Sequence, residues 1–291
     1  MNGEDQQQNV QQQNTEPQQN VHHPNAHIVT HQILPVVIAA IFLVGPPGLF
    51  VYLAQSSRES TEADYYQQAA NQARWPDPRL VSKTLDGFKP DEPVKVVTWT
   101  QHQWVSSYQQ PDSKTGVDVW VTKLDSLKKF CQDYVRWSGA NGDQLALRLK
   151  ERLGLPPDAA YDTFVELSLD PKDKDRLFRP CGDPSINTTT CNPPLPAAAA
   201  DVWSNQPGRN QSQNQFKDEI REWMLRNYYS NYTSQDPHPW TELGYTFDWA
   251  REGFSNDFNR YGESEFVIPE GTPVHFVSAA TTMAYCTPRN H

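Results

Sequence analysis

Basic residues are scarce in this sequence, and none occurs before Arg58. The chain carries 25 lysines and arginines against 35 aspartates and glutamates, which gives a formal net charge of −10 at pH 7. A protein that binds nucleic acid needs a basic stripe to neutralise phosphates, so we expect no nucleic-acid partner. The same charge argues against docking on an anionic lipid surface.

The sequence also lacks the motifs of common catalytic and cofactor sites. It contains no Gly-x-Ser-x-Gly, no His-Glu-x-x-His, no phosphate-binding loop and no dinucleotide fingerprint. No Cys-x-x-Cys pair or nearby histidine accompanies the four cysteines, which argues against a zinc site. We therefore expect no cofactor and no metal, and a non-enzymatic protein rather than an enzyme.

The first 32 residues have almost no apolar side chains and carry only acidic charges among runs of glutamine and asparagine. Such a composition buries too little surface to offset chain entropy, so residues 1–32 are predicted to be a disordered leader. Its histidines are His22, His23, His27 and His31. They could form a loose metal-binding tract, but a solvated tail is the simpler interpretation, because no fold fixes their geometry.

One long uncharged apolar run, residues 33–54, follows the leader. As a helix it would span roughly 33 Å, about the thickness of a bilayer core, and it predicts a single-pass transmembrane anchor. An alternative is a secretory signal peptide with its apolar region at 33–44 and cleavage after Ala54. The missing basic residues before the run, and Tyr52 where a small residue should stand, argue against cleavage.

The anchor contains the sequence Gly45, Pro46, Pro47, Gly48. The prolines lack backbone N–H groups and clash with the preceding turn, so we expect a kink there. Carbonyl groups freed at a kink need partners in lipid, and the glycines permit close approach of another helix. The motif predicts packing against a second copy of the chain or another membrane protein, although a lone anchor can also tolerate a bend.

After the anchor, residues 55–93 are expected to form a juxtamembrane helix and linker, and residues 94–291 the folded domain. Its helices and strands do not follow a regular βαβ rhythm, which predicts an α+β fold with a mainly antiparallel sheet and helices on one face. Apolar spacing predicts helices over 62–74, 125–138, 143–153 and 215–229, and strands over 94–100, 117–122, 161–169 and 243–249, with a hairpin of 265–268 and 274–278 and an extended end over 281–286.

Two disulfides are predicted from the cysteine positions. Cys181 and Cys191 bracket a loop with little packing of its own, which covalent closure would stabilise by roughly 2–3 kcal/mol. This pairing leaves Cys131 with Cys286, for which two free buried thiols are the alternative.

The orientation of the anchor is predicted from two signals that disagree. All four cysteines follow the anchor, and disulfides persist in oxidising compartments, which favours a domain outside the cytoplasm. Arg58 and Arg74 also follow the anchor, and the positive-inside rule then leans toward the cytoplasm. Because this lean rests on very few charges, we expect a cell-membrane protein whose C-terminal domain is extracytoplasmic.

Candidate binding residues lie in the aromatic region near residue 240, and they are His238, Trp240, Asp248 and Trp249. His238 is held between two prolines in a rigid turn. Asp248 alternates with aromatic residues, so its carboxylate could perform acid–base chemistry or grip a sugar hydroxyl, although a solvated outward position is more usual.

Two functions are consistent with these observations. The first is a non-enzymatic envelope protein that binds a membrane protein or a wall polymer. The second is an anchored enzyme that acts on a glycan through carboxylates beside Trp and Tyr. A cleft with tryptophans and two carboxylates about 5–10 Å apart would favour the enzyme, whereas an open aromatic patch would favour binding.

Overall fold

The computed structural model describes residues 61–75, 78–89, 91–109, 114–192, 211–251 and 260–288, without the side chains of 211–217. These ranges belong to one unit, residues 57–291. The predicted leader 1–32 and the anchor 33–54, with its Gly45–Gly48 kink, lie outside the described residues. Within those ranges no helix is both long and apolar enough to cross a membrane. The anchor therefore stays a prediction.

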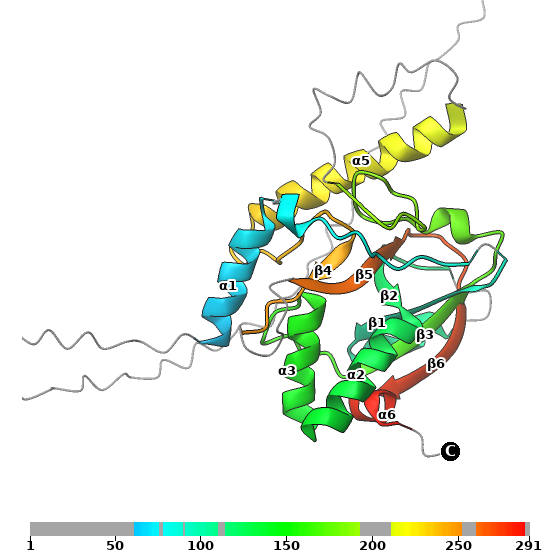
Figure 1. Cartoon of the computed structure of the whole chain (residues 1–291). Coiled ribbons are helices and arrows are strands. Elements are labelled where there is room, and N and C mark those ends of the chain that lie inside the picture. The colour runs from blue at the N-terminus through cyan, green and yellow to red at the C-terminus, as the bar shows by residue number, and fades with distance from the viewer. Residues whose placement is uncertain are drawn as a thin grey trace, which may run out of the picture. The chain divides into compact units, whose positions relative to one another are not determined.

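A six-stranded antiparallel sheet forms the centre of the domain (Figure 1). The strands are β1 (Val94–Thr100), β2 (Val119–Lys123), β3 (Thr163–Leu169), β4 (Tyr245–Phe247), β5 (Tyr261–Ile268) and β6 (His275–Thr281). Their spatial order is β4-β5-β2-β1-β3-β6, and every neighbouring pair is antiparallel. The structure confirms the predicted α+β class with an antiparallel sheet.

Helices flank this sheet. They are α1 (Glu62–Ala73), α2 (Leu124–Ser138), α3 (Gly142–Leu153), α5 (Gln211–Tyr232) and α6 (Thr282–Cys286), with short 3₁₀ turns η1 (Pro78–Leu80), η2 (His102–Tyr108) and η3 (Lys174–Arg176). Both α2 and α3 end at a glycine in the left-handed region, Gly139 and Gly154, with φ of 65° and 66°. Only glycine adopts this conformation without steric cost, so these stops could be predicted from the sequence.

Both faces of the central strands are buried. On one face, Val97 of β1 packs with Leu127 of α2 and Leu149 of α3. On the other, Val96 packs with Leu177, which belongs to the irregular segment after β3. Burial of such aliphatic side chains contributes about 1.5–3 kcal/mol each, so this irregular segment stabilises the sheet as the helices do.

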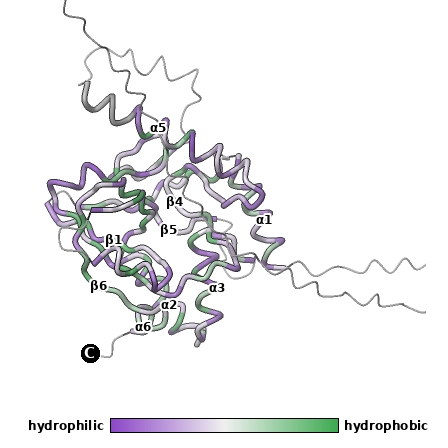
Figure 2. The backbone as a smooth tube through the Cα atoms, turned by 180° about the vertical axis from the view of Figure 1, so that it is seen from behind, coloured by the Kyte–Doolittle hydropathy of each residue, from purple (hydrophilic) through white to green (hydrophobic). Residues whose placement is uncertain are grey.

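Helix α1 is part of the folded unit. Thr61 and Asp64 form a capping box at its first turn. The helix buries Tyr66 and Ala69 against Phe247 of β4 and the following Trp249, while its outer turns are hydrophilic (Figure 2). The helix that we expected to precede the domain as a juxtamembrane element thus packs on the edge of the sheet.

Two predicted strands are wrong in part. The predicted strand 243–249 shortens to β4, because Glu242 and Gly244 take left-handed φ values of 55° and 76° and turn the chain just before it. The predicted extended end over 281–286 is helix α6, which Thr281 caps by accepting a hydrogen bond from the backbone N–H of Ala284.

Two disulfides join the same cysteine pairs that the sequence predicted. Cys131 of α2 and Cys286 of α6 have Cα atoms 5.1 Å apart. Cys181 and Cys191 have Cα atoms 6.0 Å apart and close the loop between them. No cysteine is free, so the second pair is not left as two buried thiols.

Candidate binding cavity

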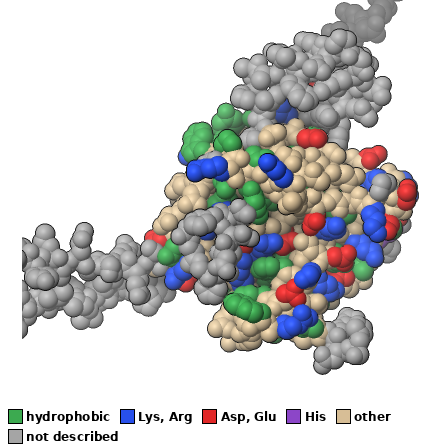
Figure 3. Space-filling view, in the orientation of Figure 1, with side chains coloured by type: hydrophobic (Ala, Val, Ile, Leu, Met, Phe, Trp, Pro, Cys, Tyr) green, Lys and Arg blue, Asp and Glu red, His purple; other side chains and the backbone are tan. Residues whose placement is uncertain are grey.

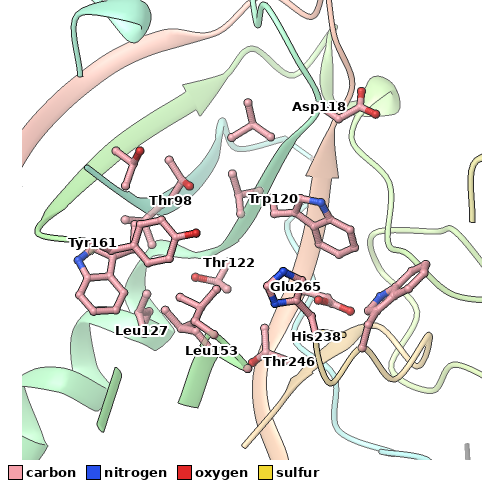
Figure 4. Close-up of a pocket in the computed structure, with 18 of the residues that line it drawn as sticks. Thr98, Asp118, Trp120, Thr122, Leu127, Leu153, Tyr161, His238, Thr246 and Glu265 are labelled. Atoms are coloured by element: carbon pink, nitrogen blue, oxygen red, sulfur yellow. The ribbon is translucent and has the colours of Figure 1, made fainter. Parts of the chain in front are cut away.

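Strands β1 and β2 separate along part of their length. They pair only through Val96 with Lys123 and Val97 with Thr122, although β2 stays paired with β5 from Val119 onward. Beyond Val97 the two strands diverge, and a cavity of about 480 Å³ opens between them (Figure 4). This volume lies within the usual range of ligand pockets, about 300–1,000 Å³. The cavity lining comes from both faces of the sheet, with Leu127 of α2 on one face and Val121 on the other.

Aromatic side chains form much of the wall. Those that line the cavity are Trp99, Tyr108, Trp120, Tyr161, Trp240 and Phe247. Trp120 and Trp240 meet edge to face with ring centroids 5.7 Å apart, and Trp223 of α5 packs against both. Trp120 remains 39% exposed at this position, so a ligand in the cavity would find an aromatic surface already in place.

Three buried polar side chains of the cavity each contain an atom that makes no hydrogen bond with the described residues. Thr122 and Glu265 face each other across β2 and β5, and they and Trp240 are 6%, 5% and 9% exposed, respectively. Thr122 Oγ1, Glu265 Oε1 and Trp240 Nε1 are three of the seven buried side-chain atoms that make no hydrogen bond in the described parts of the chain. Leaving such atoms unpaired costs about 1–3 kcal/mol each, so the cavity has a polar end that a ligand could satisfy.

Burial raises the pKa of the Glu265 carboxyl to about 8, against the opposing effects of the Trp240 indole and the Arg179 guanidinium. The indole N–H of Trp240 lies close enough to the carboxyl to favour its ionised form as a hydrogen-bond donor, although the two groups do not meet the distance and angle of a well-formed hydrogen bond. At neutral pH this carboxyl is therefore protonated in most molecules.

His238 lies beside Glu265 in the cavity (Figure 4). Its Nδ1 shares a 2.7 Å hydrogen bond with the Tyr66 hydroxyl, and both its backbone groups bond to the Asn231 side chain at 2.8 Å. Burial lowers the pKa of the imidazole and Asp236 raises it in part, so the ring is neutral at pH 7. The side chain is fixed by Tyr66, which leaves Nε2 as the ring nitrogen that a ligand could reach.

The predicted residues divide into two pairs. His238 and Trp240 line the cavity. Trp249 packs against Tyr66 of α1 and donates its indole N–H to the Leu155 carbonyl at 3.1 Å. Trp249 therefore helps to hold α1 against the domain, and it does not line the cavity.

The interpretation of Asp248 as a solvated outward residue is wrong. Asp248 is 7% exposed and forms a bidentate ion pair with Arg148 of α3. The two guanidinium N–H groups donate to the two carboxylate oxygens, with N···O distances of 3.0 and 2.7 Å. This carboxylate is committed to a buried structural bond, so it cannot supply the acid–base or sugar-binding group that the sequence suggested.

Glu265, Thr122 and Tyr66 were missed as site residues. In the sequence, Glu265 belongs to the alternation of Glu263 and Glu265 with Ser264 and Phe266, which is typical of a half-exposed strand. Nothing local indicates that this carboxyl is buried, because the groups that enclose it come from β2 and from the loop after α5.

The spacing of carboxylates in the cavity does not suit glycoside hydrolysis. Asp118 is the other carboxylate that lines the cavity, but it is bonded to the Trp223 indole at 2.6 Å and to the Glu270 N–H at 2.9 Å. Asp118 precedes β2, its backbone is roughly 13 Å from that of Thr122 at about 3.3 Å per residue, and Trp120 lies between Asp118 and Glu265 (Figure 4). Glycosidases place their carboxylates about 5–10 Å apart.

A second hollow of about 500 Å³ lies between α2 and α3. Its charged groups are already paired, since Arg152 bonds Glu263 at 2.8 Å and Arg148 bonds Asp248. Hydrophobic side chains lie between charged ones on the face of the molecule in Figure 3. Trp137, which lines this hollow, is 74% exposed. None of the unbonded buried polar atoms of the described residues lines this hollow.

Within the described parts of the chain, no group of His, Cys, Asp or Glu is arranged to hold a metal ion. Comparison of the chain with protein-family models, with curated proteins and with solved structures finds no match.

Proposed function

We propose that this domain is a non-enzymatic binding module and that its ligand occupies the cavity between β1 and β2. The observation that carries the proposal is the convergence of unbonded Thr122 Oγ1, Glu265 Oε1 and Trp240 Nε1 in one cavity. Buried polar atoms of native proteins nearly always have partners, and a ligand is the partner that this site would take.

The walls support the same proposal. Ligand sites are usually apolar clefts with a few well-placed polar groups, and here aromatic rings surround one polar end that includes the neutral His238. The enzymatic alternative has weaker support, because Asp248 is committed to Arg148 and Asp118 stands far from Glu265.

The setting that we propose is an envelope protein, anchored in the cell membrane by residues 33–54, with the domain outside the cytoplasm. The two disulfide pairs support this placement, because disulfides form and persist in oxidising compartments. The ligand would then be a group presented by a membrane protein or by a wall polymer.

The test uses the purified full-length chain with ¹⁵N-labelled tryptophan and a set of neutral, cationic and anionic fragments. We expect bound fragments to move the indole N–H signals of Trp120 and Trp240, assigned with W120F and W240F, and to leave the exposed Trp137 signal in place. Fragments that bind without moving the two cavity signals would contradict the proposal.

A cavity-filling variant gives an independent test. Thr98 lines the cavity, so Thr98→Trp should fill it and weaken fragment binding at least tenfold. Thr189→Trp makes the same substitution at an exposed position of the Cys181–Cys191 loop and should leave binding unchanged. Equal binding by both variants would place the ligand elsewhere.

A further inference from the structure

The charges around the cavity are of one sign. Asp118 and Glu265 are the acidic residues in its wall, and none of the described lining residues is a lysine or arginine. The chain as a whole also carries an excess of negative charge, −10 at pH 7. An anionic ligand would therefore meet like charge on entering, whereas a cation would be attracted.

Among the described residues, the Arg179 guanidinium acts on the Glu265 carboxyl electrostatically but forms no salt bridge with it. Arg179 instead donates to the carbonyls of Gly244 at 2.8 Å, of Ile186 at 3.4 Å and of Asp86. It also stacks on Phe266, 4.4 Å from the ring centroid. Phe266 follows Glu265 on β5, so the two side chains point to opposite faces of the sheet. Arg179 therefore bonds and stacks with groups on the far face of the sheet, and it forms no salt bridge with Glu265.

Other elements around Glu265 contribute few titratable groups. His238 faces it from the loop after α5, and its imidazole is neutral at pH 7 because burial lowers its pKa. Glu263 shares its face of β5 but is bonded to Arg152 of α3 at 2.8 Å. Helices α2, α3 and α5 and turn η2 line the cavity with uncharged residues, and the segment before β2 adds Asp118 at the far end.

Aromatic faces complete a cation site. The ring faces of tryptophan and tyrosine attract ammonium groups, and aromatic cages of this kind recognise organic cations. Trp120 and Trp240 meet at right angles beside Glu265, with an interplanar angle of 88°. The two rings touch, so a ligand would lie in the corner that their perpendicular faces form, where it would contact two aromatic surfaces and a carboxyl group at once.

We infer that the cavity binds an organic ammonium group, with Glu265 as its counter-ion and Trp120 and Trp240 as its aromatic walls. This inference rests on the proposed function and specifies the chemical class of the ligand. The ammonium group could belong to a free small molecule or to a lysine side chain of a partner, and the experiment separates these sources.

Binding of the cation is coupled to loss of a proton. In the free protein Glu265 holds its proton at pH 7, because its pKa is about 8. A bound ammonium ion stabilises the carboxylate, so the O–H bond breaks, the proton passes to the buffer, and the ligand keeps its charge. Affinity should therefore rise with pH, by up to about tenfold per unit below pH 8, and level off above it.

Titration calorimetry of the full-length chain tests the inference with two matched pairs of probes. Choline is compared with its neutral isostere, in which carbon replaces the quaternary nitrogen. N-acetyl-lysine amide is compared with N-acetyl-norleucine amide. We expect at least one cation to bind at least tenfold more tightly than its neutral partner, and the pair with the larger preference identifies the source.

Substitutions in the cavity test where the cation binds. Glu265→Gln keeps the size of the side chain, and it should abolish both the preference for the cation and the pH dependence of its affinity. Trp120→Leu should weaken cation binding several-fold, and Trp137→Leu should not. If neither cation binds more tightly than its neutral partner, or if the preference survives Glu265→Gln, the inference is overturned. Displacement of the cavity indole signals by neutral fragments would in that case still support the proposed function.

Discussion

Tyr66 of α1 and His238 of the loop after α5 are joined by a 2.7 Å hydrogen bond, although 172 positions separate them in the sequence. Tyr66 is 3% exposed and packs edge to face on Trp249, 5.6 Å between centroids. The first helix of the domain therefore reaches one wall of the cavity directly.

Substitution of Tyr66 by phenylalanine removes this bond and leaves His238 Nδ1 buried without a partner. We expect the free energy of unfolding to fall by about 1 kcal/mol, measured by urea denaturation. Tyr65→Phe is the matched control, because the Tyr65 side chain is only partly buried and makes no hydrogen bond with the described residues. Equal losses from both variants would show that the bond adds nothing to stability.

The buried ion pair of Arg148 with Asp248 should matter far more than a surface pair. Asp248→Asn removes the closer partner of Arg148 and leaves only its 3.4 Å pair with Glu151, so we expect a loss of about 3 kcal/mol. Asp133→Asn makes the same change in a pair with Lys129 whose two side chains are 77% and 44% exposed, and it should change stability little, because solvent screens an exposed pair. Chemical denaturation of both variants decides the comparison, and similar losses would contradict the assigned role of Asp248.

Stability of the domain should decrease as pH rises from 5 to 8. Burial raises the pKa values of Glu265 to about 8 and of Glu242 to about 7. Between the usual carboxyl pKa and these values the folded state holds protons that the unfolded state has released, so each group lowers stability by up to about 1.4 kcal/mol per pH unit.

Urea midpoints between pH 5 and pH 9 check this prediction. Glu265→Gln cannot ionise, so its profile should be flatter than that of the wild type, chiefly between pH 5 and 8. Glu270→Gln changes a carboxylate in the exposed turn after β5 and should follow the wild-type profile. A wild-type profile that rises with pH over this range would show that these carboxyls are not buried as protonated groups.

Much of the sheet could be predicted from local patterns. The limits of β1 agree with its prediction, because valines alternate through a strand that is buried beside β3. Helix α6 could not be predicted, since its few residues are held by the Thr281 cap and by packing of Tyr285 on Phe164. Packing of this kind is not visible in a short stretch of sequence.

Only the part of the candidate site that lies in a locally rigid turn could be predicted from the sequence. The sequence Pro-His-Pro-Trp indicated a rigid turn, and His238 and Trp240 do line the cavity. Asp248 was misread because its partner Arg148 lies 100 positions away. The cavity itself depends on the separation of β1 from β2, which follows from tertiary structure and leaves no periodic signal in either strand.

The two disulfides should differ in their contribution to stability. In the chain-entropy model, loss of the Cys131–Cys286 bridge, with a sequence separation of 155, costs roughly 5 kcal/mol. Loss of the Cys181–Cys191 bridge, with a separation of 10, costs roughly 3 kcal/mol. All four cysteines are buried, so the double Cys→Ala variants remove similar packing and are matched controls for each other.

Denaturation of the two double variants under oxidising conditions measures this difference. We expect the Cys131/Cys286 variant to be the less stable of the two, and the gap should disappear when the wild type and both variants are compared in reductant. Non-reducing peptide mapping of protein isolated from its native compartment should recover both bridged peptides. Free thiols at all four positions would contradict the bridges, and would also remove the main support for a domain outside the cytoplasm, because the orientation was inferred from the cysteines against the lean of Arg58 and Arg74.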